Sequence, residues 1–273
     1  MLKLLRYLRH GPLRCFDTAW LFLGRIYRSS LAKISLINAV QMCVGNYGPF
    51  KFNPQFAFSN FKQWGEGHNN GFTACIEMCR NKHCVVDVGA HIGLVTMPMS
   101  SVIAENGRVI AVEPAAMNLK YLREHLAKNY IDNVDLYDCL LGGEEKQNIA
   151  FFEQNTATGM NSVVVKKNHN HYIKKYKDQK TLDIIFQKNS LAPEVIKIDV
   201  EGAEINVLRG AINTIKRYQP IIFLSVHPAE IKLLRQSLDE LKTLILSLGY
   251  RAMNIDGSPI NEFALKEYIL QPE

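Results

Sequence analysis

Two groups of residues in the sequence combine glycines with carboxylates in patterns that could support chemistry. The first is the segment DVGAHIG at residues 87–93, followed by Glu113. Gly89 can take backbone angles closed to other residues, and Gly93 lets the next helix pack close to the preceding strand. Glu113 ends a second apolar run, where an acidic side chain can accept hydrogen bonds from ribose hydroxyls. The pattern predicts a site for a nucleotide-like cofactor.

The glycine turn lacks one residue that a dinucleotide site needs. Such a site has a further glycine where the backbone touches a pyrophosphate, whereas this turn has His91 between Ala90 and Ile92. The spacing therefore suits S-adenosylmethionine, which carries an adenosine but no diphosphate. We expect Asp87 to lie near its methionine ammonium group. The predicted cofactor contacts from this turn are Asp87, Gly89, Ala90, His91 and Gly93, together with Glu113.

The second group is VIKIDVEGAE at residues 195–204, a buried-strand pattern that ends in Asp199 and Glu201. Ligands of open α/β sheets bind outside the carboxyl ends of the strands, so these carboxylates are predicted at the same rim as Gly89. His227 ends the next apolar run, and its ordinary pKa near 6.5 suits a general base. For Glu204 we favour a different role, in which its charge stabilises the helix N-terminus.

The elements that must position these residues alternate between strands and helices from Cys84 onward. Strands are expected at 84–88, 109–113, 134–139, 195–199 and 220–227, and helices at about 93–104, 115–130, 203–217 and 229–248. Asp138 and Cys139, at the end of the third strand, are further candidates for cofactor contact. Asp256-Gly257 between apolar stretches indicates a hairpin over residues 251–270. The prediction is an α/β fold with a mostly parallel sheet and a C-terminal antiparallel hairpin.

Bulk composition narrows the class of protein. The chain has 273 residues, 47% of them hydrophobic, and a net charge of +6, so it can bury a full core and is not a disordered protein. No apolar run reaches the roughly 18–20 residues that a membrane span requires. Arginines recur through the start of the chain, where a secretory signal would be apolar. We therefore expect a cytoplasmic protein.

The six cysteines are too sparse and irregular for a disulfide scaffold. Cys75, Cys79, His83 and Cys84 lack the paired spacing of a structural zinc site, and we interpret the thiols as small buried hydrophobes. No metal ligands are assigned.

Residues 1–80 are predicted to form an N-terminal extension, and residues 81–273 the main domain. Seven Lys or Arg face one acidic residue, Asp17, over residues 1–33, and apolar positions between them suggest amphipathic helices. We favour a helical cap on the main domain, while a basic face lying on an anionic membrane surface or an acidic partner stays an alternative. Six aromatic residues at 50–64, between turn signals, predict a short aromatic hairpin.

The ordered motifs over residues 80–230 resemble the FkbM family of S-adenosylmethionine-dependent methyltransferases. The turn at 87–93, Glu113-Pro114 with Asn118, and Asn161-Ser162 before Thr181-Leu182-Asp183 resemble successive family motifs. Residues 197–210, KIDVEGAEINVLRG, resemble the most distinctive one. The resemblance implies a Rossmann-like class I methyltransferase fold and adds Asn118 to the expected cofactor contacts. Ser225 departs from the family, because many members carry glutamate there.

The resemblance further implies O-methylation of a hydroxyl on a saccharide, glycolipid or related metabolite. The protein must then align a hydroxyl in line with the activated methyl group, at about 3–3.5 Å, and remove its proton. We expect Asp199 or His227 to act as base and Glu201 to orient the acceptor. Hard oxygen ligands at the rim would also allow Mg²⁺, and the sequence leaves this open.

The acceptor and the oligomeric state are not determined by the sequence. The lysine-rich segment 166–180 could attract an acidic or phosphorylated acceptor, or form a solvated loop. Nucleic acid is not expected as a partner, since no recognition motif accompanies the charge. Two alternatives remain: a non-catalytic or regulatory protein that binds S-adenosylmethionine, and a nicotinamide oxidoreductase, which His91 disfavours.

Overall fold

The computed structural model describes residues 8, 12, 19–20, 23–24, 38–157, 159, 161–163, 172–188 and 191–273. The amphipathic helices expected within residues 1–33, with their basic face, therefore lie almost entirely outside the described residues. The same holds for residues 166–171 of the lysine-rich segment.

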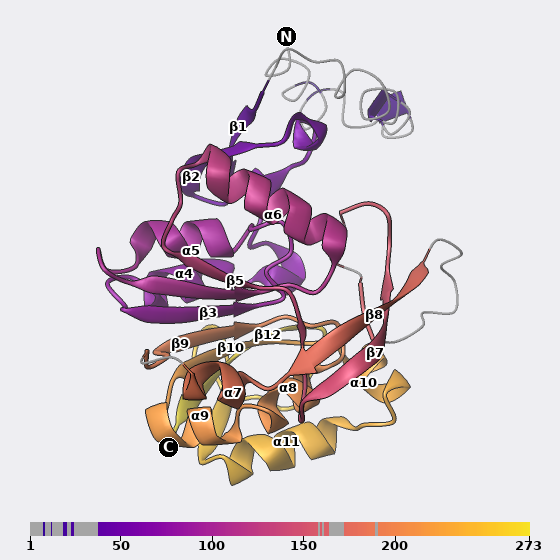
Figure 1. The fold of residues 1–273 in the computed structure, drawn as a ribbon. Helices are drawn as coiled ribbons and strands as arrows, with labels where there is room; N and C mark the ends of the chain where they lie inside the picture. Colours follow the sequence, from indigo (N-terminus) through magenta and orange to yellow (C-terminus); the bar gives the residue numbers. More distant parts are fainter. Residues whose placement is uncertain are drawn as a thin grey trace.

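A seven-stranded sheet forms the centre of the molecule (Figure 1). Its strand order is β11-β12-β10-β9-β3-β4-β5, and neighbouring strands from β10 to β5 are parallel. β12 runs antiparallel to both β10 and β11. The strands are β3 (Cys84–Val88), β4 (Arg108–Val112), β5 (Val134–Tyr137), β9 (Val195–Ile198), β10 (Ile221–Val226), β11 (Tyr250–Asn254) and β12 (Lys266–Pro272). This order, with one antiparallel strand inserted beside a parallel sheet, is the predicted class I methyltransferase fold.

Both faces of the sheet are buried, which explains why its central strands are almost continuously apolar. Side chains alternate between the faces along each strand. In β3, Val86 and Val88 pack in one hydrophobic cluster, whereas Val85 packs in the other. The first cluster joins the sheet to the C-terminal helices, and the second joins it to helices from the first half of the chain.

Helices cover the two faces in two groups (Figure 1). On one face lie α4 (Phe72–Met78), α5 (Thr96–Val102) and α6 (Ala116–Lys128); on the other lie α7 (Leu182–Gln187), α8 (Glu204–Arg209), α9 (Ile212–Tyr218), α10 (Pro228–Leu233) and α11 (Leu238–Ser247). Two helices expected to be continuous are each divided in two: the helix expected at 203–217 is α8 and α9, and the helix expected at 229–248 is α10 and α11. α8 and α9 separate at Gly210, where a Cβ atom would lie 1.9 Å from the carbonyl oxygen of Gly142.

Two smaller sheets flank the central one. β1 (Val40–Val44) and β2 (Tyr47–Phe52) form the aromatic hairpin, whose turn lies at Gly45-Asn46. Short 3-10 helices follow at Pro54–Phe56, Phe61–Gln63 and Gly67–Asn69. β6 (Leu140–Leu141), β7 (Lys146–Glu153) and β8 (Ile173–Lys180) form the second sheet. The second half of the lysine-rich segment is therefore a strand, β8, and not a loop.

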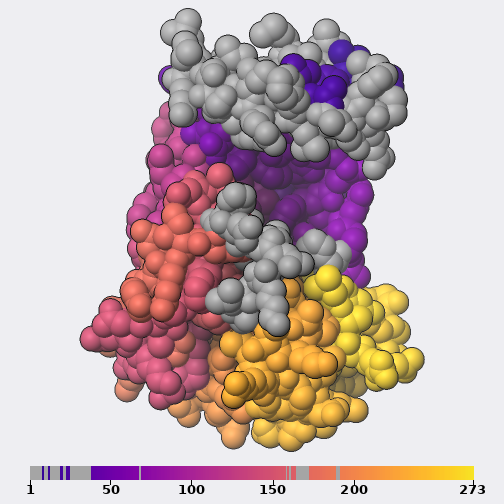
Figure 2. Space-filling view, turned by 90° about the vertical axis from the view of Figure 1, so that its right-hand side faces the viewer, coloured from indigo at the N-terminus to yellow at the C-terminus, as the bar shows by residue number. Residues whose placement is uncertain are grey.

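The hairpin and α4 belong to the same packing unit as the sheet. Phe50, Phe52 and Phe72 share a buried cluster with Val85 and Val109 of the central strands. In the space-filling view, β7 and β8 form part of the surface beside the C-terminal helices (Figure 2). Among the described residues, none of the helices combines the length and apolar character that crossing a bilayer demands.

Candidate active site at the carboxyl edge of the sheet

The glycine turn after β3 brings two strands into close backbone contact. Gly89 has φ +89°, and a Cβ atom on it would lie 1.9 Å from the carbonyl oxygen of Asp199. Gly93 has φ +94°, and a Cβ atom there would meet Leu122 of α6 at 2.8 Å. Both positions need glycine for backbone conformation and for space. The turn thus fixes the end of β3 against the end of β9.

Glu113, directly after β4, is almost completely buried and holds the turn from the side. Its Oε2 accepts a hydrogen bond from the backbone N–H of His91 at 2.8 Å, and its Oε1 accepts from the N–H of Ala115 at 2.9 Å. The side chain of Asn118 donates to Oε1 at 3.1 Å. Burial raises the pKa of Glu113 to about 7, against the effect of these three donors.

His91 and Asp87 are the other polar residues of this half of the pocket. His91 takes φ +51°, and its Nε2 is buried without a hydrogen-bond partner among the described residues. Burial lowers its pKa to about 4, so its ring is neutral near pH 7. Asp87 accepts a hydrogen bond from the hydroxyl of Thr96 at 2.5 Å, and burial raises its pKa to about 6.

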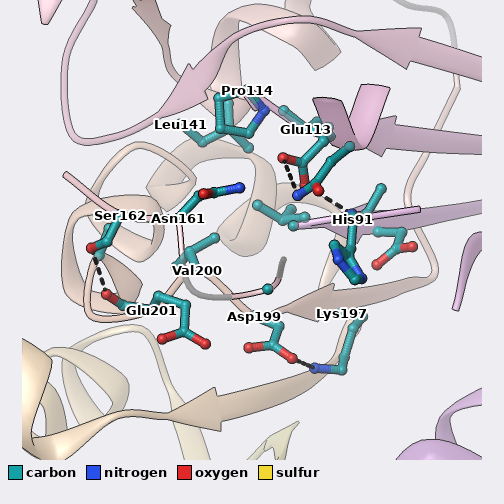
Figure 3. Close-up of a pocket in the computed structure, with 18 of the residues that line it drawn as sticks. His91, Glu113, Pro114, Leu141, Asn161, Ser162, Lys197, Asp199, Val200 and Glu201 are labelled. Carbon is teal, nitrogen blue, oxygen red and sulfur yellow. Dashed lines mark hydrogen bonds and ion pairs between the residues drawn. The ribbon is translucent and has the colours of Figure 1, made fainter. Parts of the chain in front are cut away.

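Asp199, Glu201 and His227 meet on the opposite side of the same pocket. Nε2 of His227 lies 3.6 Å from Oδ1 of Asp199 and 3.6 Å from Oε1 of Glu201. Figure 3 shows the two carboxylates together on one side of the pocket, with Glu113 on the other. Glu201 has φ +51°, a left-handed conformation that is uncommon for a residue with a side chain.

The ring of His227 is oriented by a buried carboxylate. Its Nδ1 lies 2.6 Å from Oε1 of Glu204, which also accepts from the backbone N–H of Gly202. Burial lowers the pKa of His227, but the hydrogen bond to Glu204 and the nearby carboxylates outweigh it and raise the pKa to about 9. Glu204 therefore does more than the predicted stabilisation of a helix N-terminus, since it also sets the orientation of His227.

Lys197, on β9, supports Asp199 from beneath the pocket. Its Nζ lies 3.3 Å from Oδ2 of Asp199, 2.7 Å from the hydroxyl of Ser225 and 2.7 Å from Oε1 of Glu267. Burial alone would lower the pKa of Lys197, but the charges of Asp199 and Glu267 raise it above its usual range. The ammonium group is therefore charged and fully paired.

Glu267, on the strand next to Ser225, supplies the carboxylate that many family members carry at the position of Ser225 itself. It lies on β12 directly opposite Ser225 of β10, and the hydroxyl of Ser225 donates to it at 3.2 Å. Ser225 thus belongs to a buried polar network with Lys197 and Glu267, in which the carboxylate comes from the neighbouring strand β12.

The structure brings eleven of the twelve predicted site residues together. Ten of them line one pocket, which is partly open to solvent and contains about 1080 Å³ of space not filled by atoms. The eleventh, Gly93, lies in the glycine turn beside it. The ten lining residues are Asp87, Gly89, Ala90, His91, Glu113, Asn118, Cys139, Asp199, Glu201 and His227. Asp138 is different. Its exposed carboxylate forms an ion pair with Lys177 of β8 at 2.8 Å, and it does not line the pocket.

Several residues of the site were not predicted as functional from the sequence. Lys197 and Glu204 stand within the KIDVEGAE segment, where a buried charge among apolar residues was a usable signal. Glu267 has no signal near it, since only the pairing of β12 with β10 brings it to Lys197. Asn161 and Ser162 also line the pocket, and the hydroxyl of Ser162 donates to the carbonyl oxygen of Glu201 at 3.0 Å.

The thiols of Cys75, Cys79 and Cys84 are buried, as expected of small hydrophobes. Burial raises the pKa of the Cys84 thiol to about 12 and that of Cys139 to about 11, so both stay protonated. Among the described residues, the group with ligand atoms close enough to share a metal ion is Asp199, Glu201 and His227.

Comparison with known proteins adds relatives of known class. The curated Methyltransferase 1 of Beauveria bassiana (strain ARSEF 2860) is 26% identical over 148 residues, covering 46% of this chain and 57% of that protein. The chain thus matches little more than half the length of this relative.

Solved structures with a similar arrangement include an FkbM methyltransferase from Methylobacillus flagellatus KT, with 22% identity, a TM-score of 0.45 and coverage of 70% of this chain and 44% of that one. A precorrin-6y C5,15-methyltransferase from Geobacter metallireducens GS-15 has 14% identity, a TM-score of 0.42 and coverage of 74% and 86%.

The family model described as the methyltransferase FkbM domain matches residues 87–252, from the first pocket carboxylate to the antiparallel strand β11. This match covers more than half of the 273 residues and includes the glycine turn, Glu113 and the Asp199–Glu201–His227 group. The chain belongs to the FkbM methyltransferase family.

Proposed function

We propose that the protein is an S-adenosylmethionine-dependent O-methyltransferase that acts on a hydroxyl of a saccharide, glycolipid or related metabolite. The observation that carries the proposal is the single pocket, in which the glycine turn and Glu113 face the Asp199–Glu201–His227 group. A methyl donor on the first side would present its methyl group towards a base on the second.

The residues present fit S-adenosylmethionine. Gly89 lets the turn close against the end of β9 beside the pocket, and the buried, unpartnered Nε2 of His91 offers a hydrogen bond within it. Glu113 is ready to accept from ribose hydroxyls, while the turn has no glycine for a pyrophosphate. When bound, the cofactor supplies an activated methyl group on a sulfonium.

Proton removal falls to the side chains opposite the cofactor. Asp199 and His227 are the candidate bases, and Glu201 is placed to hold the acceptor hydroxyl. A positioned base contributes roughly 10²- to 10⁴-fold to such a step. His227 acts as base only in its neutral form, so its raised pKa makes activity increase with pH towards about 9.

The exposed lysines on β8 favour the interpretation that the acceptor is acidic or phosphorylated. Lys174, Lys175 and Lys180 are exposed on this strand, and a cluster of positive charge raises the local concentration of anions. We further propose that the protein works in the cytoplasm.

The test is transfer of a labelled methyl group from S-adenosylmethionine to saccharide fractions, using the full chain with and without EDTA. We expect transfer to oxygen, with kcat lowered roughly 10²- to 10⁴-fold in His227→Asn or in Asp199→Asn. Tight cofactor binding without turnover on any acceptor would instead favour a non-catalytic binding protein. Transfer to an amine would contradict O-methylation.

A further inference from the structure

We propose that Asp199, Glu201 and His227 bind one divalent transition-metal ion of the Mn²⁺ type on the acceptor side of the pocket. Each side chain offers one ligand atom, and these atoms all lie within 4.8 Å of one another. The site faces the space in which an acceptor must lie. That the ion also holds the acceptor hydroxyl rests on the proposed function, whereas binding of the ion does not. A bound ion occupies Nε2 of His227, so in the metal-loaded protein His227 is a ligand and not the base.

The spacing of the ligand atoms fits a common ion. Nε2 of His227 is 3.6 Å from each carboxylate oxygen, which is beyond the usual length of a hydrogen bond. Ligand atoms about 2.1 Å from one octahedral ion lie about 3 Å apart when adjacent and about 4.2 Å apart when opposite. The two separations from Nε2 fall between these values, and all three ligand atoms lie within 4.8 Å of one another. Small side-chain adjustments would therefore bring them around one ion.

A buried histidine aimed into the site is the independent observation that points to a ligand. The His227 side chain is only 7% exposed, and its Nδ1 is engaged by Glu204, which is fully buried. Within the described part of the chain no hydrogen bond reaches Nε2, whose neighbours are the two carboxylate oxygens. Metal-binding histidines characteristically donate their other ring N–H to a carboxylate, which orients the ring.

Lys197 prepares Asp199 for the same role. It contacts Oδ2 of Asp199, whereas Oδ1 is the atom that faces His227. Because Glu267 balances the charge of Lys197 at 2.7 Å, the two site carboxylates keep enough negative charge to neutralise a divalent ion.

The mixed ligand set selects the class of ion. Magnesium prefers an all-oxygen shell, whereas an imidazole beside carboxylates suits a first-row transition metal. Three protein ligands leave up to three positions on an octahedral ion for water or for acceptor oxygens. An acceptor that fills two of these positions would carry a second hydroxyl close to the methylated one.

The test is a titration of the chelator-treated full chain with Mn²⁺. Binding is measured as the loss of the EPR signal of the free ion. We expect one saturable site in the wild type and at least a 100-fold weaker affinity in Asp199→Asn and in Glu201→Gln. Glu204→Gln, which changes the group that orients His227, should weaken binding roughly 10- to 100-fold. Glu240→Gln, a partly exposed carboxylate paired with Arg209, is the matched control and should bind as the wild type does.

A second measurement needs no variant. The bound Mn²⁺ should show electron–nuclear coupling to an imidazole nitrogen in pulsed EPR of the wild type. Absence of a saturable site, absence of that coupling, or unchanged affinity in both Asp199→Asn and Glu201→Gln would overturn the metal site. Displacement of Mn²⁺ by an equal concentration of Mg²⁺ would overturn its assignment to a transition metal.

Calorimetric titration of the same metal-free protein with S-adenosylmethionine separates the two proposals. Mn²⁺ binding without cofactor binding supports the metal site and removes the proposed function. Cofactor binding and metal-independent transfer, with no Mn²⁺ site, remove only the metal site.

Discussion

At the scale of single residues, Glu113 combines nearly complete burial with three hydrogen-bond donors. Its pKa in the folded protein, about 7, is above the ordinary value of 4.5. The folded state therefore binds a proton more tightly than the unfolded state, and the stabilisation that results is fully present below pH 4.5. It is lost as the pH rises through about 7, because the slope of stability with pH follows the difference in bound protons.

We predict that Glu113→Gln reduces the loss of stability that accompanies the rise in pH. Between pH 4.5 and 7.5 the free energy of unfolding of the wild type should fall by about 2–3 kcal/mol more than that of the variant. Urea unfolding at a series of pH values measures the difference. Asp87, whose pKa is also raised, contributes a slope of its own in both proteins. Parallel curves for the two proteins would show that Glu113 ionises normally in the folded state.

Gly89 offers a second prediction at this scale. In Gly89→Ala the new methyl group would collide with the carbonyl oxygen of Asp199, so β3 and β9 must separate at the pocket. We expect a loss of about 3–5 kcal/mol in the free energy of unfolding, together with weaker cofactor binding. Gly257→Ala is the control, since Gly257 also has positive φ, +81°, but nothing lies within 4 Å of the added atom. It should cost only about 1 kcal/mol, and equal losses in both variants would contradict the collision.

At the scale of elements, the antiparallel strand β12 completes the site from far along the sequence. Its Glu267 balances the buried charge of Lys197 and accepts a hydrogen bond from the backbone N–H of Gly71, before α4, at 2.7 Å. The strand therefore links the support of Asp199 to the start of a helix on one face of the sheet.

We predict that Glu267→Gln destabilises the protein by about 3–5 kcal/mol, because Lys197 is left as an incompletely compensated buried charge. Chemical denaturation of Glu267→Gln, Lys197→Met and the double variant gives the coupling between the two residues. The double variant should lose much less than the sum of the single losses. Strict additivity, or a Glu267→Gln loss no larger than that of the partly exposed Glu240→Gln, would contradict the pairing.

The elements also show what the sequence could predict and why the remainder was missed. β3, β4, β9 and β10 are buried on both faces, so each forms an apolar run that can be recognised directly. β8 has the sequence IKKYKDQK and most of its side chains are exposed, so its hydrophobicity gives no strand signal. Glu267 reaches Lys197 only through the register that places it opposite Ser225, and long-range register cannot be obtained from local spacing.

At the scale of the whole molecule, residues on both sides of the predicted boundary between residues 80 and 81 pack in one hydrophobic core. Phe52 of β2 is fully buried and contacts Phe61 and His125, with ring centroids 5.0 and 4.8 Å away. His125 belongs to α6, within the predicted main domain, and its Nε2 accepts a hydrogen bond from the backbone N–H of Asn53. The described part of the extension is thus joined to the sheet by packing and by hydrogen bonds.

This packing predicts that the two regions unfold together. Phe52→Ala should remove about 3–5 kcal/mol and lower the unfolding midpoint of the entire structure in one transition, because the lost contacts connect β2 to α6. Far-ultraviolet circular dichroism and tryptophan fluorescence, recorded on the same urea series, should give coincident curves. Leu246→Ala, at an exposed position of α11, should change the midpoint little. Separate transitions, with Phe52→Ala shifting only the one reported by Trp20 and Trp64, would instead establish residues 1–80 as an independent unit.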